Sequence, residues 1–582
     1  MTVFAGDLSF GASLVGENRT RFRLWAPAKS MVLLEIDGRP ALPMRAAGDG
    51  WFEAEADCGD GARYLYRVDD LLVPDPASRA QSPDVHGPSV VVDPRAYDWR
   101  TPDWRGRPWE ETVIYEVHAG LMGGFKGVAD RLSELAALGV TAVELMPIAD
   151  FPGRRNWGYD GVLPYAPDSA YGSPGELKAL IDRAHALGLM VFLDVVYNHF
   201  GPDGNYLSAY APNFFREDIH TPWGGAIDFR SPEVSRFFIE NAVYWTQEYR
   251  FDGLRFDAVH AIAPSEWLDE MGEAVRAAAE PDRHIHLILE NENNSATRLA
   301  GPFDAQWNDD FHNVLHVLLT GETGAYYQDF ADRLAERLAR CLAEGFIYQG
   351  EPSPNHDDEP RGEPSAHLAP TAFVAFLQNH DQVGNRALGE RLTLLAHPDA
   401  LRAATALLLL SPQIPLIFMG DEAGSRSPFL FFTDFHDELA DAVREGRRKE
   451  FAKFPAFADP EKREHIPDPN AVETYRRSQV EPGPDAYDWR AFYKALLALR
   501  HGEIAPRLKG ATALQAHAIG PKAVFAAWRM GDGATLSIAL NLDTEAVPFD
   551  GAPKTQPLFS HGETWNDTLG PHRVIVWLDA AS

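Results

Sequence analysis

Two hydrophobic periodicities divide the chain. In the first hundred residues, apolar and polar positions alternate in short runs such as 20–26, 31–36 and 62–68, with Gly and Asp between the runs. Short strands separated by such turn residues predict a β-sandwich over residues 1–100. Strand patterning returns near the C-terminus in residues 523–528, 535–541 and 573–577, and it predicts a small β-domain over residues 505–582.

Between these two regions, apolar runs of strand length alternate with amphipathic helical windows. Near-continuous apolar strands are typical of a parallel sheet that is buried on both faces. Eight such runs alternate with helices, so residues 108–502 are predicted to form an α/β fold, a (β/α)8 barrel (TIM barrel) with loop insertions. The expected strands are 113–117, 140–146, 189–196, 251–256, 285–289, 303–307, 372–377 and 416–419. The expected helices are 128–138, 174–188, 232–249, 265–279, 326–343, 400–410, 444–453 and 487–499.

Polar side chains directly follow four of the expected strands. In a (β/α)8 barrel the active site lies at the carboxyl ends of the strands. One polar residue at such a place is ordinarily a loop cap or a surface charge, but four strand ends that agree indicate one functional rim. The four groups are Asp194, Asn198 and His199; Arg255, Asp257 and His260; Glu290; and Gln378, Asn379, His380 and Asp381.

This set of side chains fits the cleavage of a glycosidic bond, which needs one carboxyl group to protonate the leaving oxygen and another to attack the anomeric carbon. Arg255 lies two residues before Asp257, so in a strand both point the same way, and the guanidinium favours an ionised nucleophile. Glu290, partly desolvated beside another carboxylate, is expected to have a raised pKa and to act as the acid. His199 and His380 are expected to be neutral donors to sugar hydroxyls. A retaining mechanism predicts carboxyl groups about 5–5.5 Å apart.

The four segments, residues 194–199, 253–260, 289–293 and 378–381, resemble in order and spacing the four signature regions of the α-amylase superfamily, glycoside hydrolase family thirteen. The resemblance implies a (β/α)8 barrel and a retaining mechanism. It also implies that Asp257 is the nucleophile, Glu290 the acid/base and Asp381 the transition-state stabiliser. We find no nucleophile elbow, P-loop or dinucleotide fingerprint that would indicate another chemistry.

Further stretches, residues 75–79, 84–88, 155–165, 306–312 and 431–434, are similar to the trehalose-releasing hydrolases of this superfamily. The similarity covers nearly the whole chain, including an N-terminal module like that of branching and debranching enzymes. The implied reaction is hydrolysis of the α-1,4 bond next to the terminal trehalose of malto-oligosyltrehalose, which releases trehalose and a malto-oligosaccharide. The alternative within the superfamily is a glycogen branching enzyme or another transferase, in which a sugar hydroxyl replaces water. A non-catalytic glucan-binding protein has no need of three converging acids.

Several other residues are candidate substrate contacts. Trp157 and Tyr159 present aromatic faces on which sugar rings stack, although loop packing explains them too. Glu292 stands where the family pattern leads us to expect aspartate. Strand alternation puts it on the same side as Glu290, so it remains an alternative acid. The remaining candidates are Arg255, His260 and the trehalose-side group Asn308, Asp309 and Asp310, which a capped helix start would also explain.

Composition limits the partners. The formal net charge is −32, so nucleic acid and anionic membrane surfaces are not expected partners, whereas a neutral α-glucan is not repelled. The two cysteines cannot form a disulfide framework, and the first 16 residues contain no Lys or Arg, so a cytoplasmic protein without a signal peptide is expected. No cofactor or metal is predicted, because the pair His312 and His316 lacks an adjacent glutamate and nothing besides Asn198 indicates calcium. Trp25 and Trp51 are expected in a core rather than on a glucan-binding face.

Overall fold

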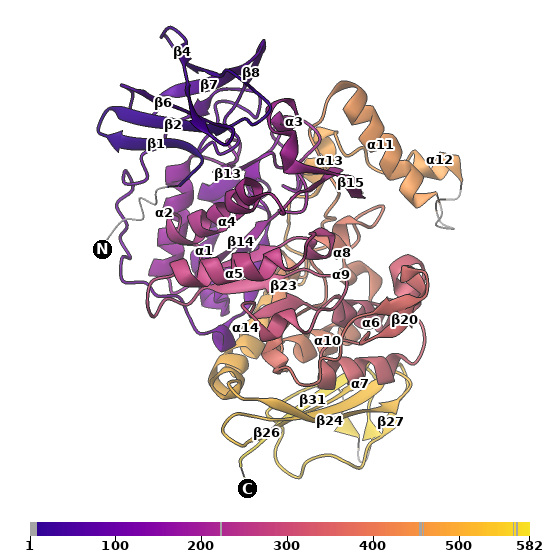
Figure 1. Cartoon of the computed structure of the whole chain (residues 1–582). Coiled ribbons are helices and arrows are strands. Elements are labelled where there is room, and N and C mark those ends of the chain that lie inside the picture. The colour runs from indigo at the N-terminus through magenta and orange to yellow at the C-terminus, as the bar shows by residue number, and fades with distance from the viewer. Residues whose placement is uncertain are drawn as a thin grey trace.

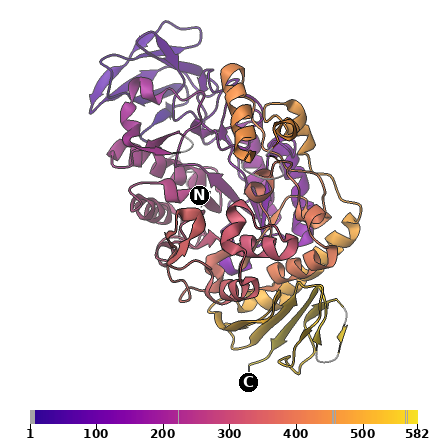
Figure 2. The same cartoon turned by 90° about the vertical axis from the view of Figure 1, so that its right-hand side faces the viewer.

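The computed structural model describes residues 8–221, 224–452, 457, 459–562, 564–565 and 568–581. The main sheets are two at the N-terminus, a closed barrel and two further sheets at the C-terminus (Figure 1). Three two-stranded sheets lie in the loops of the barrel: β12 (Ala149–Asp150) with β13 (Leu163–Pro167), β15 (Phe215–Thr221) with β16 (Gly224–Ile227), and β20 (Glu351–Ser353) with β21 (Glu359–Arg361). Seen from the side, the N-terminal and C-terminal sheets lie at opposite ends of the barrel (Figure 2). The expected fold class, a TIM barrel between two β-structures, is therefore confirmed.

The barrel consists of eight parallel strands, which match the eight expected apolar runs. They close in the order β10-β11-β14-β17-β18-β19-β22-β23. Every residue of these strands is buried, because side chains fill the barrel interior and helices cover its outside. The strands are β10 (Ile114–Val117), β11 (Ala142–Leu145), β14 (Met190–Val195), β17 (Gly253–Phe256), β18 (His286–Leu289), β19 (Ala305–Trp307), β22 (Phe373–Phe376) and β23 (Ile414–Phe418).

The helices around the barrel begin and end at residues that suit those places. Helix α1 (Gly124–Leu138) ends at Gly139, which is left-handed with φ 111. Helix α2 (Pro174–Ala186) begins with a capping box between Ser173 and Glu176. The others are α3 (Leu207–Tyr210), α4 (Pro232–Gln247), α5 (Trp267–Ala278), α6 (Asp309–Thr320), α7 (Leu334–Glu344), α8 (His380–Gly384), α9 (Leu392–Leu395), α10 (Pro398–Leu410), α11 (Asp437–Phe451), α12 (Pro460–Arg463), α13 (Val472–Arg477) and α14 (Ala486–Leu499).

One expected helix, 326–343, is wrong in extent. The structure has a 3-10 segment at Ala325–Phe330, and α7 begins only at Leu334. Arg333 lies between them with φ 46, a left-handed conformation that no helix can continue through. The amphipathic pattern runs across this break, so periodicity alone could not reveal it.

The N-terminal part pairs two antiparallel sheets around an apolar core. Trp25 and Trp51 are each only 6% exposed and belong to this core, as expected. One sheet contains β1 (Gly11–Gly16), β2 (Arg19–Trp25), β6 (Trp51–Ala56) and β5 (Arg45–Gly48); the other contains β4 (Leu42–Pro43), β3 (Leu33–Ile36), β7 (Arg63–Val68), β8 (Leu71–Val73) and β9 (Ser89–Val90).

The C-terminal part repeats the two-sheet arrangement. Its larger sheet lies against α7, where the Trp528 indole N–H donates to the Leu342 carbonyl at 3.1 Å. Within the described residues, no helix is long and apolar enough to cross a membrane. The larger sheet contains β24 (Thr512–Gly520), β25 (Ala523–Arg529), β26 (Thr535–Asn541), β31 (Arg573–Asp579) and β28 (Phe559–His561); the smaller contains β27 (Val547–Pro548), β30 (Thr568–Leu569) and β29 (Thr564–Trp565).

Candidate active site

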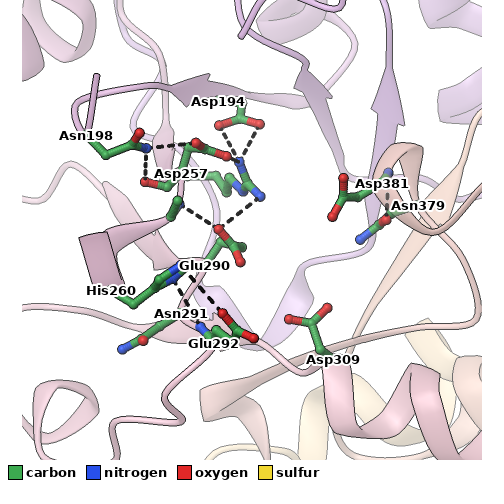
Figure 3. Close-up of polar contacts among 12 residues, drawn as sticks. Asp194, Asn198, Asp257, His260, Glu290, Asn291, Glu292, Asp309, Asn379 and Asp381 are labelled. Carbon is green, nitrogen blue, oxygen red and sulfur yellow. Dashed lines mark hydrogen bonds and ion pairs between the residues drawn. The ribbon is translucent and has the colours of Figure 1, made fainter. Parts of the chain in front are cut away.

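Asp257 follows β17 directly and is held from two sides. The Nη1 of Arg255 lies 2.8 Å from Asp257 Oδ1, and the Nδ2 of Asn198 lies 2.9 Å from Oδ2 (Figure 3). Arg255 is 2% exposed, and the same Nη1 lies 2.8 Å from each oxygen of Asp194 at the end of β14. Charge-assisted hydrogen bonds of this kind are short and directional, so the Asp257 carboxylate has a fixed orientation at the rim.

Glu290 follows β18 and lies next to this ion pair. Its Oε2 accepts from the Ala258 backbone N–H at 2.5 Å and lies 3.8 Å from Nη2 of Arg255. Ala258 has φ 41, a left-handed conformation that is uncommon for a residue with a Cβ. Burial raises the pKa of Glu290 well above its usual range, with the Asp257 charge adding to the effect and Arg255 opposing it. A raised pKa favours the protonated form, as expected for an acid.

Asp381 enters from the opposite side of the rim. It lies in the first turn of α8, where the Asn379 side chain caps the helix by accepting from the backbone N–H of Asp381 at 3.0 Å. Its Oδ1 accepts from Asn385 Nδ2 at 2.6 Å. Figure 3 shows an open space with Asp257 and Glu290 on one side and Asp381 on the other. The three carboxylates that the sequence singled out thus surround one centre.

Tyr159 and His380 form a stacked pair beside Asp194. The rings lie 5.1 Å apart at 24°, and His380 Nε2 is 2.8 Å from the Tyr159 hydroxyl, which donates to Asp194 at 2.6 Å. The other ring nitrogen of His380 lies 2.5 Å from Glu116 Oε1. Burial lowers the pKa of His380, but the Glu116 carboxylate outweighs it and raises the pKa above its ordinary value. This direction favours the protonated ring, whereas the sequence led us to expect a neutral His380.

Glu292 contacts two histidines rather than the Arg255 ion pair that Glu290 joins. Strand β18 ends at Leu289, and the alternation of side chains stops with it. The Glu292 side chain is 53% exposed; its Oε1 lies 3.2 Å from His356 Nε2 and its Oε2 lies 3.7 Å from His260 Nε2. Figure 3 shows contacts between His260 and Glu292 but none from either of them to the Glu290 carboxyl group. The geometry favours Glu290 over Glu292 as the acid.

The segment 308–310 sends only one of its three side chains to the centre. Asp309 faces it (Figure 3), and burial raises the pKa of Asp309 to about 7, with the Asp381 charge adding to the effect. The Asn308 amide instead donates to the Gly345 carbonyl at 2.9 Å. Asp310 is fully buried and accepts from the Ile347 backbone N–H at 2.7 Å. Successive residues at a helix start point in directions about 100° apart, which explains the difference.

Trp157 and His199 are both largely buried beside the site. Trp157 is 5% exposed, donates from its indole N–H to the Leu430 carbonyl at 2.9 Å and packs edge-on against His380. His199 is 6% exposed and contacts the Asn198 side chain through its Nδ1. Burial lowers the pKa of His199, a direction that favours the neutral ring expected there.

Sequence reasoning missed two residues that contact the site residues, Glu116 and His356. Glu116 lies inside β10, where a single charge in an apolar run was a usable signal. Its register partner on β11 is Glu144, whose oxygens have no hydrogen-bond partner among the described residues. Burial raises the pKa of Glu144 well above its usual range. His356 lies on the hairpin formed by β20 (Glu351–Ser353) and β21 (Glu359–Arg361), and its sequence context carries no comparable signal.

The two histidines considered as a metal pair have protein partners. His312 Nδ1 lies 2.6 Å from the Leu377 carbonyl, and His316 Nε2 lies 2.8 Å from Glu322. In the part of the chain that the structure describes, no three His, Cys, Asp or Glu side chains are arranged to hold a metal ion.

Comparison with known proteins places this site in a family. The model of the alpha amylase catalytic domain matches residues 92–217, and a domain of unknown function matches residues 511–576. The malto-oligosyltrehalose trehalohydrolase of Deinococcus radiodurans is 41% identical over 507 residues, which cover 84% of this chain and 82% of that protein. The chain belongs to the malto-oligosyltrehalose trehalohydrolase family. The member of this trehalohydrolase family from Saccharolobus solfataricus is 39% identical and covers 85% and 87%.

Solved structures agree with this placement. A structure named as an alpha amylase from Salmonella typhimurium has a TM-score of 0.93 and 47% identity, and covers 98% of this chain and 100% of its own. A pullulanase from Anoxybacillus, with a TM-score of 0.71 and 19% identity, shares the fold. A branching enzyme from Jannaschia is 33% identical, but over only 45% of this chain and 42% of its own. The trehalohydrolase family therefore accounts for more of the chain than the branching enzymes do.

Proposed function

We propose that this protein hydrolyses the α-1,4 bond next to the terminal trehalose of malto-oligosyltrehalose and releases trehalose and a malto-oligosaccharide. One observation carries the chemistry. Asp257 accepts hydrogen bonds at both carboxylate oxygens from Arg255 and Asn198, while burial raises the pKa of neighbouring Glu290 well above its usual range and favours its protonated form. Two carboxyl groups in different protonation states at one centre are what retaining glycoside cleavage requires. Membership of the trehalohydrolase family supports the choice of substrate.

In the first step we assign Asp257 as the nucleophile and Glu290 as the acid. Asp257 forms a bond to the anomeric carbon of the glucose unit whose glycosidic bond is cut. As that bond breaks, Glu290 gives its proton to the departing oxygen, and trehalose leaves with an intact hydroxyl group. Asp381, across the open space, stabilises the positive charge that develops on the sugar ring.

In the second step the roles of Glu290 reverse. Its carboxylate takes a proton from water, the water oxygen attacks the anomeric carbon, and Asp257 leaves as a carboxylate. The released malto-oligosaccharide has the α configuration at its new reducing end. If a sugar hydroxyl took the place of water, the same residues would catalyse transfer, so the carboxylates alone do not separate hydrolase from branching enzyme.

The residues around the centre divide between the two sides of the bond. We assign Tyr159, His199, Arg255 and His380 to the glucose unit that is attacked, and Asp309, His260 and Glu292 to the trehalose side. Trp157, Asn308 and Asp310 then serve as supports, because their polar atoms are bonded within the protein.

We further propose a cytoplasmic enzyme with a neutral substrate. Cys58 and Cys341 are both buried and unpaired, which suits a reducing compartment. The net charge of −32 disfavours nucleic acid and anionic membranes as partners.

The test is an incubation with maltotriosyl-trehalose and, separately, with maltopentaose, followed by chromatography of the products. We expect trehalose and maltotriose from the first and little reaction with the second. Longer chains formed from either compound would move the protein to the transferases. Equal cleavage of both would leave the glycosidase and remove the specificity for trehalose. The Asp257→Asn variant, which lacks the nucleophile, serves as the inactive control.

A further inference from the structure

Glu116 directs both of its oxygens at one residue of the site. Its Oε1 lies 2.5 Å from His380 Nδ1, and its Oε2 accepts from the His380 backbone N–H at 3.0 Å. Glu116 is 1% exposed and His380 is 2% exposed, so water does not compete for these bonds. A single carboxylate thus fixes both the ring and the main chain at the start of α8.

The hydrogen-bond partners of Tyr159 and His380 indicate which of their atoms carry protons. The hydroxyl of Tyr159 has one proton, and Asp194, at 2.6 Å, can only accept it while ionised. The Nε2 of His380, 2.8 Å from the same hydroxyl, must then be the donor to Tyr159. The Nδ1 faces the Glu116 carboxylate and donates as well. Both ring nitrogens carry protons, so His380 is an imidazolium ion.

A series of hydrogen bonds connects His380 to the nucleophile Asp257. Tyr159 is held between His380 and Asp194, and both oxygens of Asp194 bond to the Arg255 Nη1 that also contacts Asp257. A neutral His380 would have only one N–H, so it could not donate to both Glu116 and Tyr159, and the contacts from Tyr159 to Asp194 and Arg255 would rearrange. The orientation of Asp257 therefore depends on a residue at the far end of the series.

We propose that Glu116 is a positioning residue of the hydrolytic site, which holds His380 as a doubly protonated donor and through it the contacts of Tyr159, Asp194 and Arg255. The inference rests on the proposed function for its turnover measurements. The Glu116 carboxylate also raises the pKa of His380 against the effect of burial. The other titratable or charged groups around His380 and Glu116 are His118 beyond the end of β10, Glu144 on β11, Tyr159, Asp194 on β14, Arg255 on β17 and Asp381 on α8 itself.

Glu144 offers a matched control. It lies opposite Glu116 in the register of β10 and β11 and is equally buried, but its oxygens have no hydrogen-bond partner among the described residues. The same Glu-to-Gln change in either strand alters one buried carboxyl group in the same layer of the barrel. Only the change at Glu116 removes a charge that faces His380.

The first experiment compares Glu116→Gln with Glu144→Gln. We expect kcat to fall about ten- to hundredfold in Glu116→Gln with a smaller change in KM, since a charge-assisted hydrogen bond that orients the reacting groups is lost. We expect Glu144→Gln to stay within about twofold of the wild type, because burial raises the pKa of that carboxyl group and it has no hydrogen bond to lose among the described residues. Equal losses in both variants, or none in Glu116→Gln, would overturn the proposal.

A second experiment requires neither that Glu116→Gln folds nor that the proposed substrate is right. In ¹⁵N-histidine-labelled wild type, the His380 signals, assigned from the spectrum of His380→Asn, should show both ring nitrogens protonated at pH 7 and titrate above about 6.5. A neutral ring at pH 7 would refute the inference. If the wild type releases no trehalose but consumes another α-glucan, the proposed function fails, and the same comparison of variants is made with that glucan.

Discussion

At the residue scale, two carboxyl groups of the site have different hydrogen-bond partners and burial, and these differences suit them to different roles. Asp257 receives hydrogen bonds from Arg255 and Asn198, whereas Glu290 receives one backbone N–H and lies 3.8 Å from the guanidinium. Burial therefore dominates at Glu290 and raises its pKa well above the usual range. The division of labour between nucleophile and acid follows from these contacts rather than from the residue types.

Replacing the acid tests this division. Glu290→Gln removes the proton donor and keeps the size of the side chain, so we expect kcat on maltotriosyl-trehalose to fall by about 10²–10⁴. Glu292→Gln is the comparison, because the Glu292 side chain is 53% exposed and bonds to histidines outside the reacting pair. We expect its effect to appear mainly in KM. A larger fall of kcat in Glu292→Gln than in Glu290→Gln would reverse the assignment.

Asp309 gives a prediction about pH. Burial raises its pKa to about 7, so between about pH 4 and pH 7 the folded protein binds a proton that the unfolded chain has already lost. The unfolded state then binds fewer protons, and the free energy of unfolding falls as the pH rises through this range. Asp309→Asn cannot titrate, so we expect its free energy of unfolding to fall less between pH 5 and pH 7.5, by on the order of 2 kcal/mol.

Urea unfolding of both proteins at the two pH values measures this difference. Parallel changes in wild type and Asp309→Asn would show that Asp309 is ionised throughout. The Asn replacement keeps the shape of the side chain, so the comparison concerns charge.

The sequence predicted the residues that follow strands better than the directions of their side chains. Asp257, Glu290 and Asp381 all lie at one centre, since the carboxyl ends of parallel strands meet at one rim. Glu292 and Asn308 lie in segments where the strand alternation no longer applies, and their directions depend on local backbone. Glu116 escaped notice because it lies within a strand rather than after one.

At the scale of elements, helix α8 is held against the aromatic packing behind the site. Gly384 is its last residue, and a Cβ there would lie 2.1 Å from Cζ2 of Trp157, which packs edge-on against His380. A methyl group cannot fit without displacing the indole. The position of His380 therefore depends on a glycine that makes no polar contact with the site.

Gly384→Ala should accordingly lower both stability and activity. We expect a loss of about 1–3 kcal/mol in the free energy of unfolding and a fall of kcat by about tenfold or more, because Trp157 and His380 shift together. Gly446→Ala in α11 is the control, since nothing lies within 4 Å of its new Cβ and alanine favours a helix by about 1 kcal/mol. Thermal unfolding and kcat of both variants decide the matter; an unaffected Gly384→Ala would show that Trp157 has room to move.

Element boundaries were predictable where local chemistry sets them. Helix α2 begins at the expected Ser-Pro pair with its capping box, and α1 ends at the expected Gly139. The break before α7 was not predictable, because arginine has no preference for the left-handed conformation that Arg333 adopts.

At the scale of the whole molecule, one apolar core runs through all three parts. Phe22 of the N-terminal sheets, Phe237 on the barrel helix α4 and Trp528 of the C-terminal sheet belong to the same cluster of buried residues. The pattern along the chain indicated the order of the parts. It could not show how they pack, because contacts between distant segments leave no periodic trace in a single sequence.

This continuity predicts that the chain unfolds as one unit and that a lesion at one end lowers the stability of the whole. Trp528 is 1% exposed, and its indole N–H donates to the Leu342 carbonyl of α7 at 3.1 Å. Trp528→Ala should therefore cost about 3–5 kcal/mol in the free energy of unfolding. We expect a single calorimetric transition at a lower temperature than in the wild type.

Tyr487→Ala is the control for this change, because Tyr487 is 85% exposed and its removal opens no cavity. We expect its transition temperature to match that of the wild type. An early separate transition in Trp528→Ala, with the main transition unmoved, would mean that the C-terminal sheets unfold alone. Activity measured below the new transition temperature should survive. The C-terminal sheet is connected to the site through α7, which packs against α6, and α6 begins at Asp309. Activity lost at temperatures where the fold persists would instead mean that the C-terminal sheets help to place Asp309.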